Sequence, residues 1–233
     1  MRLSIVVPVF NEAATLRAAL APLASLRTAG HELIVVDGGS SDGTQAIAQS
    51  LVDQQLADQV VLAPRGRAAQ MNAGAALARN EILLFLHVDT QLPTNADRMV
   101  MGAIDAGARW GRFDVTIVGR SRGLVMVAAL MNWRSRLTGI ATGDQAVFVR
   151  RDVFRAVGGF PAIALMEDVA LAHTLKKHSR PACLHATVAT SGRRWDKNGL
   201  WRTIFLMWRL RAAYALGASP DRLHAIYYGR PSA

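Results

Sequence analysis

The stretch "ILLFLHVDTQLP" (residues 82–93) indicates how this chain folds. Its first five residues are continuously apolar, as in a strand that is buried on both faces of a parallel sheet. The run then ends abruptly in His87, Asp89 and Thr90, with a proline close behind. An ionisable pair at the end of a buried strand costs stability unless solvent, a partner or a ligand compensates it. The pair therefore predicts a binding site at this end of the strand.

Apolar strands and intervening helices also precede this stretch. Alternation of buried strands with helices is typical of an α/β fold whose mostly parallel sheet is covered on both faces. We predict strands over residues 3–10, 31–37, 58–64 and 81–90, and helices over residues 12–26, 44–55 and 67–79, with Asn11 as the N-cap of the first helix.

Polar residues cluster at the carboxyl ends of these successive strands. In open α/β sheets that edge is where ligands bind. The residues concerned are Asn11, Glu12, Asp37, Arg65, Arg67, His87 and Asp89.

The pattern changes after Ala108. We predict a strand over residues 110–119, a helix over 121–139, a strand with a helix start and glycine turn over 144–160, a helix over 166–179, a strand over 181–194 and a helix over 199–217. No repeat and no linker-like stretch interrupts the chain. We therefore expect one domain, residues 1–233, with two halves (1–115 and 116–192) and a C-terminal helical segment (193–233).

Composition narrows the class of protein. With 51% hydrophobic and 19% charged residues, 233 residues bury a sizeable core. The single cysteine, Cys183, excludes an internal disulfide and a cysteine-based zinc site, and it fits a reducing compartment. No apolar run is long enough to span a bilayer, and a strand pattern begins at once without a signal peptide. These features favour a cytoplasmic location.

The net charge of +10 comes almost entirely from arginine. Such a balance is compatible with nucleic acid, an anionic membrane surface or phosphate-bearing substrates, and codon bias is an equally simple explanation of the count. Nucleic acid is the least favoured partner, because the arginines are dispersed and no aromatic residues interleave with them outside the C-terminal segment.

The segment "VVDGGSSDGT" (35–44) combines a strand end with three glycines and three hydroxyl residues. One interpretation is a tight turn in which Asp42 or Ser41 caps the next helix. The other is that Asp37 accepts hydrogen bonds from a base or ribose at the carboxyl edge. The segment lacks the G-x-G-x-x-G pattern of dinucleotide-binding folds, which disfavours a dehydrogenase.

Five separated motifs, taken in order, carry a family resemblance. They are "SIVVPVFNE", "IVVDGGSSDGT", "MNAGAALA", "FLHVDT", and "GGF" followed by "MEDVAL". Together they resemble glycosyltransferase family 2 over roughly residues 3–175, in a version similar to a small single-domain branch. The resemblance implies the GT-A fold, with a Rossmann-like half that binds a nucleotide-diphosphate sugar (UDP-linked is favoured), an acceptor half, and an inverting transfer to a hydroxyl group.

The resemblance also implies roles on the donor side. The nucleotide site would be lined by Pro8, Asn11 and Glu12, with Asp37 at the base. The family's usual second acid after this aspartate is Gly38 here. Arg65 or Arg67 would lie beside the base and phosphates, since a guanidinium suits phosphate oxygens bidentately. The simpler interpretation of both arginines is an exposed helix start.

The family's D-x-D metal motif maps onto His87-Val88-Asp89. Asp89 would hold Mn²⁺ or Mg²⁺ against the diphosphate, because hard cations take oxygen ligands and substrate phosphates supply several. An imidazole is a poor ligand for Mg²⁺, so we expect His87 to face the ribose or to orient Asp89. The simpler interpretation is a hydrogen bond between His87 and Asp89 alone.

The pair Glu167-Asp168 begins a predicted helix. Alone, such a pair most often complements the helix dipole. The resemblance implies instead that Asp168 is the general base, with Glu167 as a like-charged neighbour that raises its pKa. Asp144 and Gln145, which follow Gly143, would face the donor sugar or the acceptor.

The C-terminal stretch "SGRRWDKNGLWRTIFLMWRLRAAYALG" (191–217) mixes tryptophan with arginine. Its helix is apolar nearly all round, which implies burial or an interface. One interpretation is that the helix packs on the domain. The other is that it contacts a lipid head group or an anionic membrane surface, and in that case the protein would be peripheral on the inner face of the membrane. Arg193 and Arg194 would approach the donor diphosphate as a lid.

Two other functions compete with glycosyl transfer. One is a nucleotide-sugar-binding protein that has lost catalysis, suggested by His87 in place of the first acid of D-x-D. The other is a nucleotidyltransferase, which would carry a glycine-rich basic loop where this chain has "PVFNEAAT" (8–15). The sequence does not distinguish between a lipid-linked molecule and a glycan as the acceptor.

Overall fold

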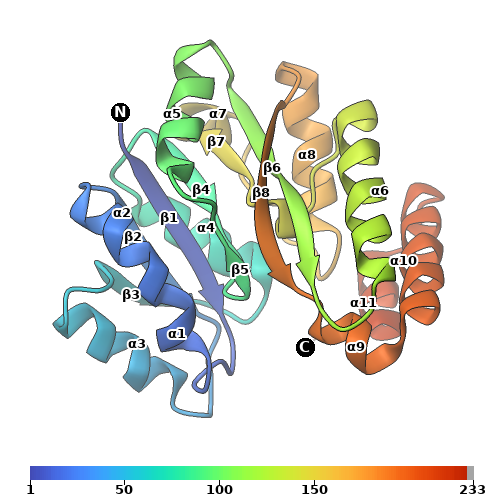
Figure 1. The fold of residues 1–233 in the computed structure, drawn as a ribbon, viewed down its shortest axis with the longest axis horizontal. Coiled ribbons are helices and arrows are strands. Elements are labelled where there is room, and N and C mark those ends of the chain that lie inside the picture. Colours follow the sequence, from blue (N-terminus) through green and yellow to red (C-terminus); the bar gives the residue numbers. More distant parts are fainter. Residues whose placement is uncertain (230–233) are drawn as a thin grey trace.

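The computed structural model describes residues 1–229, and one eight-stranded sheet forms the centre of this part of the chain (Figure 1). The strand order is β3-β2-β1-β4-β7-β6-β8-β5. The first four strands are parallel, β7 is antiparallel to both of its neighbours, and β5 is antiparallel to β8. The strands are β1 (Leu3–Val9), β2 (Glu32–Asp37), β3 (Gln59–Leu62), β4 (Ile82–Phe85), β5 (Thr90–Gln91), β6 (Trp110–Val118), β7 (Phe148–Arg150) and β8 (Ala182–Ser191).

Helices cover both faces of the sheet, as its apolar strands require. Every residue of β1, β2 and β4 is buried, and their side chains alternate between two apolar clusters. Helices α1 (Leu16–Leu20), α2 (Ala24–Thr28), α3 (Thr44–Asp53), α5 (Ala96–Asp105) and α6 (Gly123–Thr138) contribute to the first cluster. Helices α4 (Arg67–Leu77), α7 (Arg151–Ala156) and α8 (Glu167–His178) contribute to the second. The predicted α/β class is confirmed.

The strand predicted over residues 81–90 is broken in two. β4 ends at Phe85, and a turn closed by the Thr90 N–H and the His87 carbonyl precedes β5. The turn carries the chain from β4, in the middle of the sheet, to β5 at its edge, where the Ser191 N–H of β8 bonds to the Asp89 carbonyl. His87 and Asp89 therefore lie in a turn between two strands, and not within a strand as predicted.

The first predicted helix, over residues 12–26, is also wrong in its details. It begins only at Leu16 and divides into α1, a 3₁₀ turn that contains Pro22, and α2. Proline supplies no backbone N–H, so a regular helix does not continue through it. Asn11 is not the N-cap: it has a positive φ of 53°, and its side chain accepts the Ser41 N–H at 2.9 Å.

Helix α4 clamps the two central strands. The Gln70 amide donates to the carbonyls of Val9 and Val36 at 2.7 and 2.9 Å, where β1 and β2 end. A Cβ added to Gly74 would lie 2.4 Å from Val6, so only glycine allows this close approach. The "MNAGAALA" motif therefore fixes the helix on the sheet.

The chain after β8 forms three helices: α9 (Arg193–Asn198), α10 (Leu200–Ala215) and α11 (Pro220–Tyr228). The predicted strand 181–194 therefore ends early, at Ser191. In α10, Ile204 packs against the first apolar cluster and Met207 against the second, and the helix lies at the side of the molecule next to α6 and α11 (Figure 1). Of the two expectations for this helix, burial or an interface, complete burial is not observed, since Trp201, Phe205 and Trp208 are 62–63% exposed.

The last four residues of the predicted C-terminal segment lie outside the described part. Across residues 1–229, no helix has the length and apolar character needed to cross a membrane.

Candidate active site

The carboxyl ends of β1, β2 and β4 meet at one edge of the sheet, where strand order reverses. The loops after β1 and β2 are joined there: the Asn11 N–H donates to Ser40 Oγ, and the Glu12 N–H donates to Thr44 Oγ1, both at 2.8 Å. Asn11 and Glu12 therefore lie at the predicted edge. Pro8 is instead buried inside β1, so its side chain does not line the surface.

Asp37 is fully buried at the end of β2. Its carboxylate accepts the N–H groups of Gly39 and Ser40 at 3.2 and 3.0 Å and also the Ser40 hydroxyl. The side chain thus holds the glycine and serine turn, and its contact with a base stays a prediction. A Cβ at Gly38 would lie 3.0 Å from the Gln70 side chain, which bonds to β1 and β2, so Gln70 occupies the space that a side chain at position 38 would need.

Two carboxylates and one guanidinium converge at the open part of this edge. Arg193 Nη2 lies 3.8 Å from both Glu12 Oε1 and Asp89 Oδ2, and Arg193 and Asp89 are accessible to solvent. The structure thus brings the predicted lid arginine to the predicted metal ligand. Within residues 1–229 no group of three or more acidic, histidine or cysteine side chains is arranged to hold a metal.

Two of the three other arginines predicted on the phosphate side lie against aromatic rings. The Arg65 guanidinium is 4.3 Å from the centre of the Phe10 ring, and that of Arg194 is 3.6 Å from the centre of Tyr227 in α11. These cation–π contacts hold both side chains in place. Arg194 is therefore tied to α11.

His87 is buried and pairs with Asp144, not with Asp89. Its Nδ1 lies 3.3 Å from Asp144 Oδ1, and a Cβ at Gly143 would lie 2.4 Å from the imidazole ring. The hypothesis that His87 orients Asp89 is therefore wrong. Asp144 is surrounded by protein although solvent reaches its side chain. This partial burial acts to raise its pKa, but the hydrogen bond with His87 and the charges of His87, Arg67 and Arg211 hold the pKa below its ordinary value.

Gln145 differs from its predicted role. Its side chain is fully buried, and its carbonyl oxygen accepts the Thr142 N–H at 3.2 Å, which closes a capping box around the 3₁₀ turn Gly143–Gln145. A buried capping side chain does not face a sugar. Asp144, which is 46% exposed, is the residue of this turn that is open to the site.

Asp168 is held by two backbone groups at the start of α8. Its Oδ2 accepts the Gly143 N–H at 2.8 Å, and its Oδ1 accepts the Val169 N–H at 2.7 Å. Met166, just before the pair, has a positive φ of 71°. Strained residues of this kind persist only where the surrounding packing imposes them, and they cluster at functional sites. Positive φ also occurs at Asn11 and Ala146, which flank the site.

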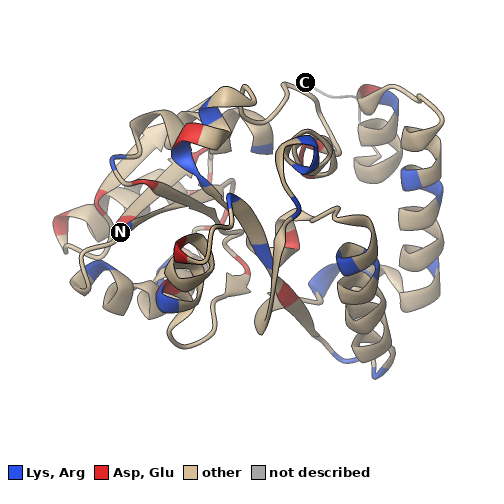
Figure 2. Ribbon diagram, turned by 90° about the horizontal axis from the view of Figure 1, so that it is seen from above, with Lys and Arg blue, Asp and Glu red and all other residues tan. Residues whose placement is uncertain are grey.

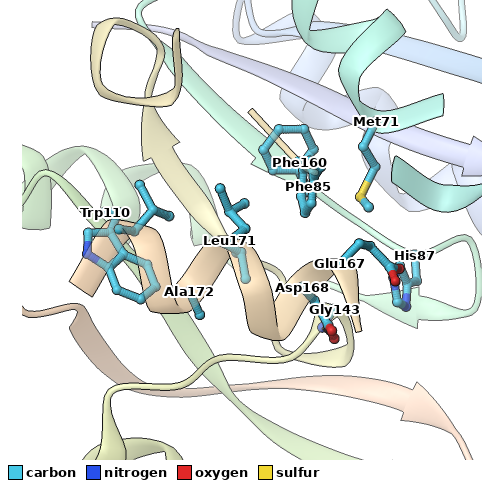
Figure 3. A pocket seen from close by; sticks show the side chains of 12 residues that line it. Met71, Phe85, His87, Trp110, Gly143, Phe160, Glu167, Asp168, Leu171 and Ala172 are labelled. Carbon is cyan, nitrogen blue, oxygen red and sulfur yellow. Dashed lines mark hydrogen bonds between the residues drawn. The ribbon is translucent and has the colours of Figure 1, made fainter. Parts of the chain in front are cut away.

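Glu167 is the group with the strongly shifted pKa. The residue is 6% exposed and its side chain lies beside His87 (Figure 3). Burial raises its pKa to about 7, and the adjacent charge of Asp168 acts in the same direction, whereas Arg67 and His87 oppose the shift. The cavity beneath the pair, between α8 and β4, has a volume of only about 10 Å³. It holds at most about one water molecule and is not a substrate pocket.

Three arginines face the Glu167-Asp168 pair. Arg67 is surrounded by protein atoms, although solvent reaches its side chain. Burial acts to lower the pKa of this guanidinium, but nearby acidic groups outweigh burial, so that the pKa is raised overall. These groups are Tyr228, Glu167, Asp144 and Asp168. Sequence reasoning missed the other two, Arg134 in α6 and Arg211 in α10. The only signal for them was an arginine within an apolar helix. Arginine positions along α10 are visible in Figure 2.

Comparison with known proteins places this geometry in a family. The model of the family described as Glycosyl transferase family 2 matches residues 4–156. Over 92 residues the chain is 37% identical to PGL/p-HBAD biosynthesis glycosyltransferases of Mycobacterium bovis and Mycobacterium tuberculosis. The match covers 38% of this chain and 36% of each relative, so the chain spans about a third of the length of these curated proteins.

Solved structures share the fold at low sequence identity. S. aureus TarS is similar with a TM-score of 0.67 and 19% identity, over 99% of this chain and 43% of that chain. TarS 1-349 in complex with UDP-GlcNAc has a TM-score of 0.64 and 18% identity, over 82% and 58%. The mannosyltransferase PcManGT from Pyrobaculum calidifontis, in complex with GDP-Man and Mn²⁺, has a TM-score of 0.62 and 21% identity, over 97% and 68%.

These likenesses show that the sheet and its helices form a GT-A fold. The family model covers well over half of the chain, including the edge that carries Glu12, Asp89 and Asp144. The protein therefore belongs to glycosyl transferase family 2.

Proposed function

We propose that this protein is an inverting glycosyltransferase that moves a sugar from a nucleotide-diphosphate donor, with UDP favoured, to a hydroxyl group of an acceptor. The observation that carries the proposal is the position of Asp168. Its carboxylate is fixed by the Gly143 N–H, and the same turn carries Asp144 beside His87. The edge where Glu12 and Asp89 share the charge of Arg193 would form the donor side of the site. The relatives that bind UDP-GlcNAc and GDP-Man support this donor class.

In the proposed reaction the acceptor oxygen attacks the anomeric carbon in line with the leaving diphosphate. The new oxygen–carbon bond forms as the old one breaks, the diphosphate leaves with the electron pair, and the configuration inverts. Asp168 accepts the proton of the acceptor hydroxyl, because a fixed carboxylate within reach of the nucleophile is an effective base. Arg193 offsets negative charge on the leaving group, since a guanidinium binds phosphate oxygens well.

The residues present fit a divalent cation. Two carboxylates, Glu12 and Asp89, already share one positive charge at an edge open to solvent, and Mn²⁺ or Mg²⁺ takes oxygen ligands from one or two carboxylates together with substrate phosphates. Asp89 would hold the ion, with Glu12 beside it. When bound, the ion supplies positive charge against the leaving diphosphate.

We predict that one of UDP, GDP, TDP and CDP stabilises the protein in the presence of Mn²⁺. At a nucleotide concentration of about 100 Kd, the Tm should rise by about 5–10 °C in a thermal-shift experiment. In Asp89→Asn the metal-dependent part of the rise should disappear. The matched control is Asp105→Asn, an exposed acid at the end of α5.

Two outcomes would contradict the proposal in different ways. If none of the four nucleotides changes the Tm, there is no donor site at this edge. If a nucleotide stabilises the protein equally with and without Mn²⁺, the role of Asp89 is wrong.

We further propose that α10 and α6 contact an anionic membrane surface. On α10, Trp201, Phe205 and Trp208 form an exposed stripe, and on α6 Trp133 is 64% exposed. The two helices start against each other, because a Cβ at Gly123 would lie 2.3 Å from Leu200, and they run side by side at the edge of the molecule (Figures 1 and 2). Exposed arginines flank the stripe on α10, which suits acidic lipid head groups: Arg202 and Arg209.

Replacing Trp208 by serine should weaken vesicle binding by about tenfold, because the indole buries apolar area at the head-group boundary. Co-sedimentation with vesicles of phosphatidylcholine and phosphatidylglycerol measures this, and phosphatidylcholine alone should bind weakly. Leu77→Ser, an exposed apolar residue on α4, is the control. Wild-type protein that stays in the supernatant with both vesicles would rule the membrane contact out.

A further inference from the structure

Two arginines near Asp168 lack the ion pairs that other arginines of this chain form. Arg134 Nη1 donates to the Ile140 carbonyl at 3.3 Å, but its Nη2 is buried without a hydrogen-bond partner among residues 1–229. Arg211 has neither a hydrogen bond nor an ion pair with any residue in that range. By contrast, Arg79 and Arg150 lie 2.7 and 2.8 Å from carboxylate oxygens. The first two guanidinium groups therefore have donors to spare.

The two charges lie close enough to affect each other. Burial, together with the charge of Arg211, lowers the pKa of Arg134 to about 10, while the charge of Asp168 opposes the shift. Burial also lowers the pKa of Arg211, against the charges of Asp168 and Asp144. Placing two partly buried like charges together costs stability unless an anion compensates them. Asp168 and Asp144 do so only in part, because both oxygens of Asp168 already accept backbone N–H groups and Asp144 is paired with His87.

Arg134 lies in α6 of the acceptor half, and Arg211 lies in α10 of the C-terminal helical segment. Arg134 bonds to Ile140, three residues before the Gly143 that holds Asp168. Arg211 follows Leu210, which is buried in the same apolar cluster as the first turn of α8. On the donor edge, the charge near Asp89 is already supplied by Arg193. The two arginine groups thus flank Asp168 from different elements.

We propose that Arg134 and Arg211 bind an anionic group, a phosphate or a carboxylate, on the acceptor whose hydroxyl Asp168 deprotonates. This inference rests on the proposed glycosyl transfer. A guanidinium binds the paired oxygens of either anion with parallel hydrogen bonds, and the unsatisfied Nη2 of Arg134 is a donor of that kind. Anchoring the anion fixes the orientation of the acceptor, so that its hydroxyl reaches the base.

The test titrates inorganic phosphate and, separately, acetate into the full chain by calorimetry, with the stabilising nucleoside diphosphate and Mg²⁺ already bound. Filling the donor site first prevents the probe from occupying it. We expect Arg134→Gln and Arg211→Gln each to weaken binding of the preferred probe by at least about tenfold. Arg98→Gln removes one exposed charge on α5 and should bind as the wild type does. The preference between the two probes identifies the anion.

Unchanged binding in both variants, or a wild type that binds neither probe, overturns the inference. Nucleotide binding and urea unfolding of each variant show whether it is folded; if Arg134→Gln is not, Arg211→Gln decides. The inference and the proposed function fail separately. If the protein binds no nucleotide but binds phosphate in a way that depends on the two arginines, the anion site is supported and the donor site is contradicted. If it binds a nucleotide but its phosphate binding does not depend on the two arginines, the donor site is supported and the anion site is contradicted.

Discussion

Asp168→Asn should lower the turnover number for sugar transfer by about 10²–10⁴-fold while the donor still binds. Asparagine has the same shape as aspartate, but its amide does not accept the proton of the acceptor hydroxyl. One of its two terminal atoms still accepts a hydrogen bond, so the contact with Gly143 or with Val169 survives. The rate of nucleoside diphosphate release from the donor measures the loss. Donor affinity, measured separately, shows that the variant still binds.

The matched control for this variant is again Asp105→Asn, which should turn over at the wild-type rate. Near-normal turnover in Asp168→Asn would mean that the base is elsewhere. A wild-type protein that binds a nucleotide sugar but never releases the nucleoside diphosphate, with hydroxyl acceptors or with water, would favour the rival function of a binding protein without catalysis.

Glu167→Gln should remove a pH dependence of stability that the wild type shows between about pH 4.5 and 7. The pKa of Glu167 rises from 4.5 to about 7 on folding, because the carboxyl is buried beside Asp168. Between these values the folded state binds more protons than the unfolded state, so the free energy of unfolding falls as pH rises. The stabilisation that protonated Glu167 gives to the folded state is complete below the pKa of the unfolded state, and it is lost as pH rises through the pKa of the folded state.

A shift of this size corresponds to about 3 kcal/mol. Glutamine resembles the protonated acid and stays neutral, so Glu167→Gln should be more stable than the wild type at about pH 8 by up to that amount, and about equal to it near pH 4. Urea unfolding at several pH values measures the difference. Glu81→Gln, an exposed acid whose pKa is lowered by backbone hydrogen bonds, should leave the slope in place. Parallel curves for the wild type and Glu167→Gln would contradict the assignment.

The local pattern of the chain was enough to predict its class and its ligand-binding edge. The apolar runs that became β1, β2 and β4 are continuous, so they predict buried parallel strands without knowledge of their neighbours. Polar residues directly after such runs must lie at the carboxyl edge, as Asn11 and Glu12 do. Breaks within the pattern were not predictable in the same way, as the division of residues 81–90 into β4 and β5 shows.

The sequence by itself determined the α/β class and the edge where polar residues gather, because both follow from neighbours along the chain. Only the tertiary structure decided which side chains pair across the site. His87 and Asp144 are 57 positions apart, and Gly143 and Asp168 are 25 apart. Arg134 lies in α6 and Arg211 in α10, two helices that are about 60 residues apart in the chain and meet only in the folded protein. Such contacts depend on how helices pack on the sheet, and neither periodicity nor spacing along the chain encodes that packing.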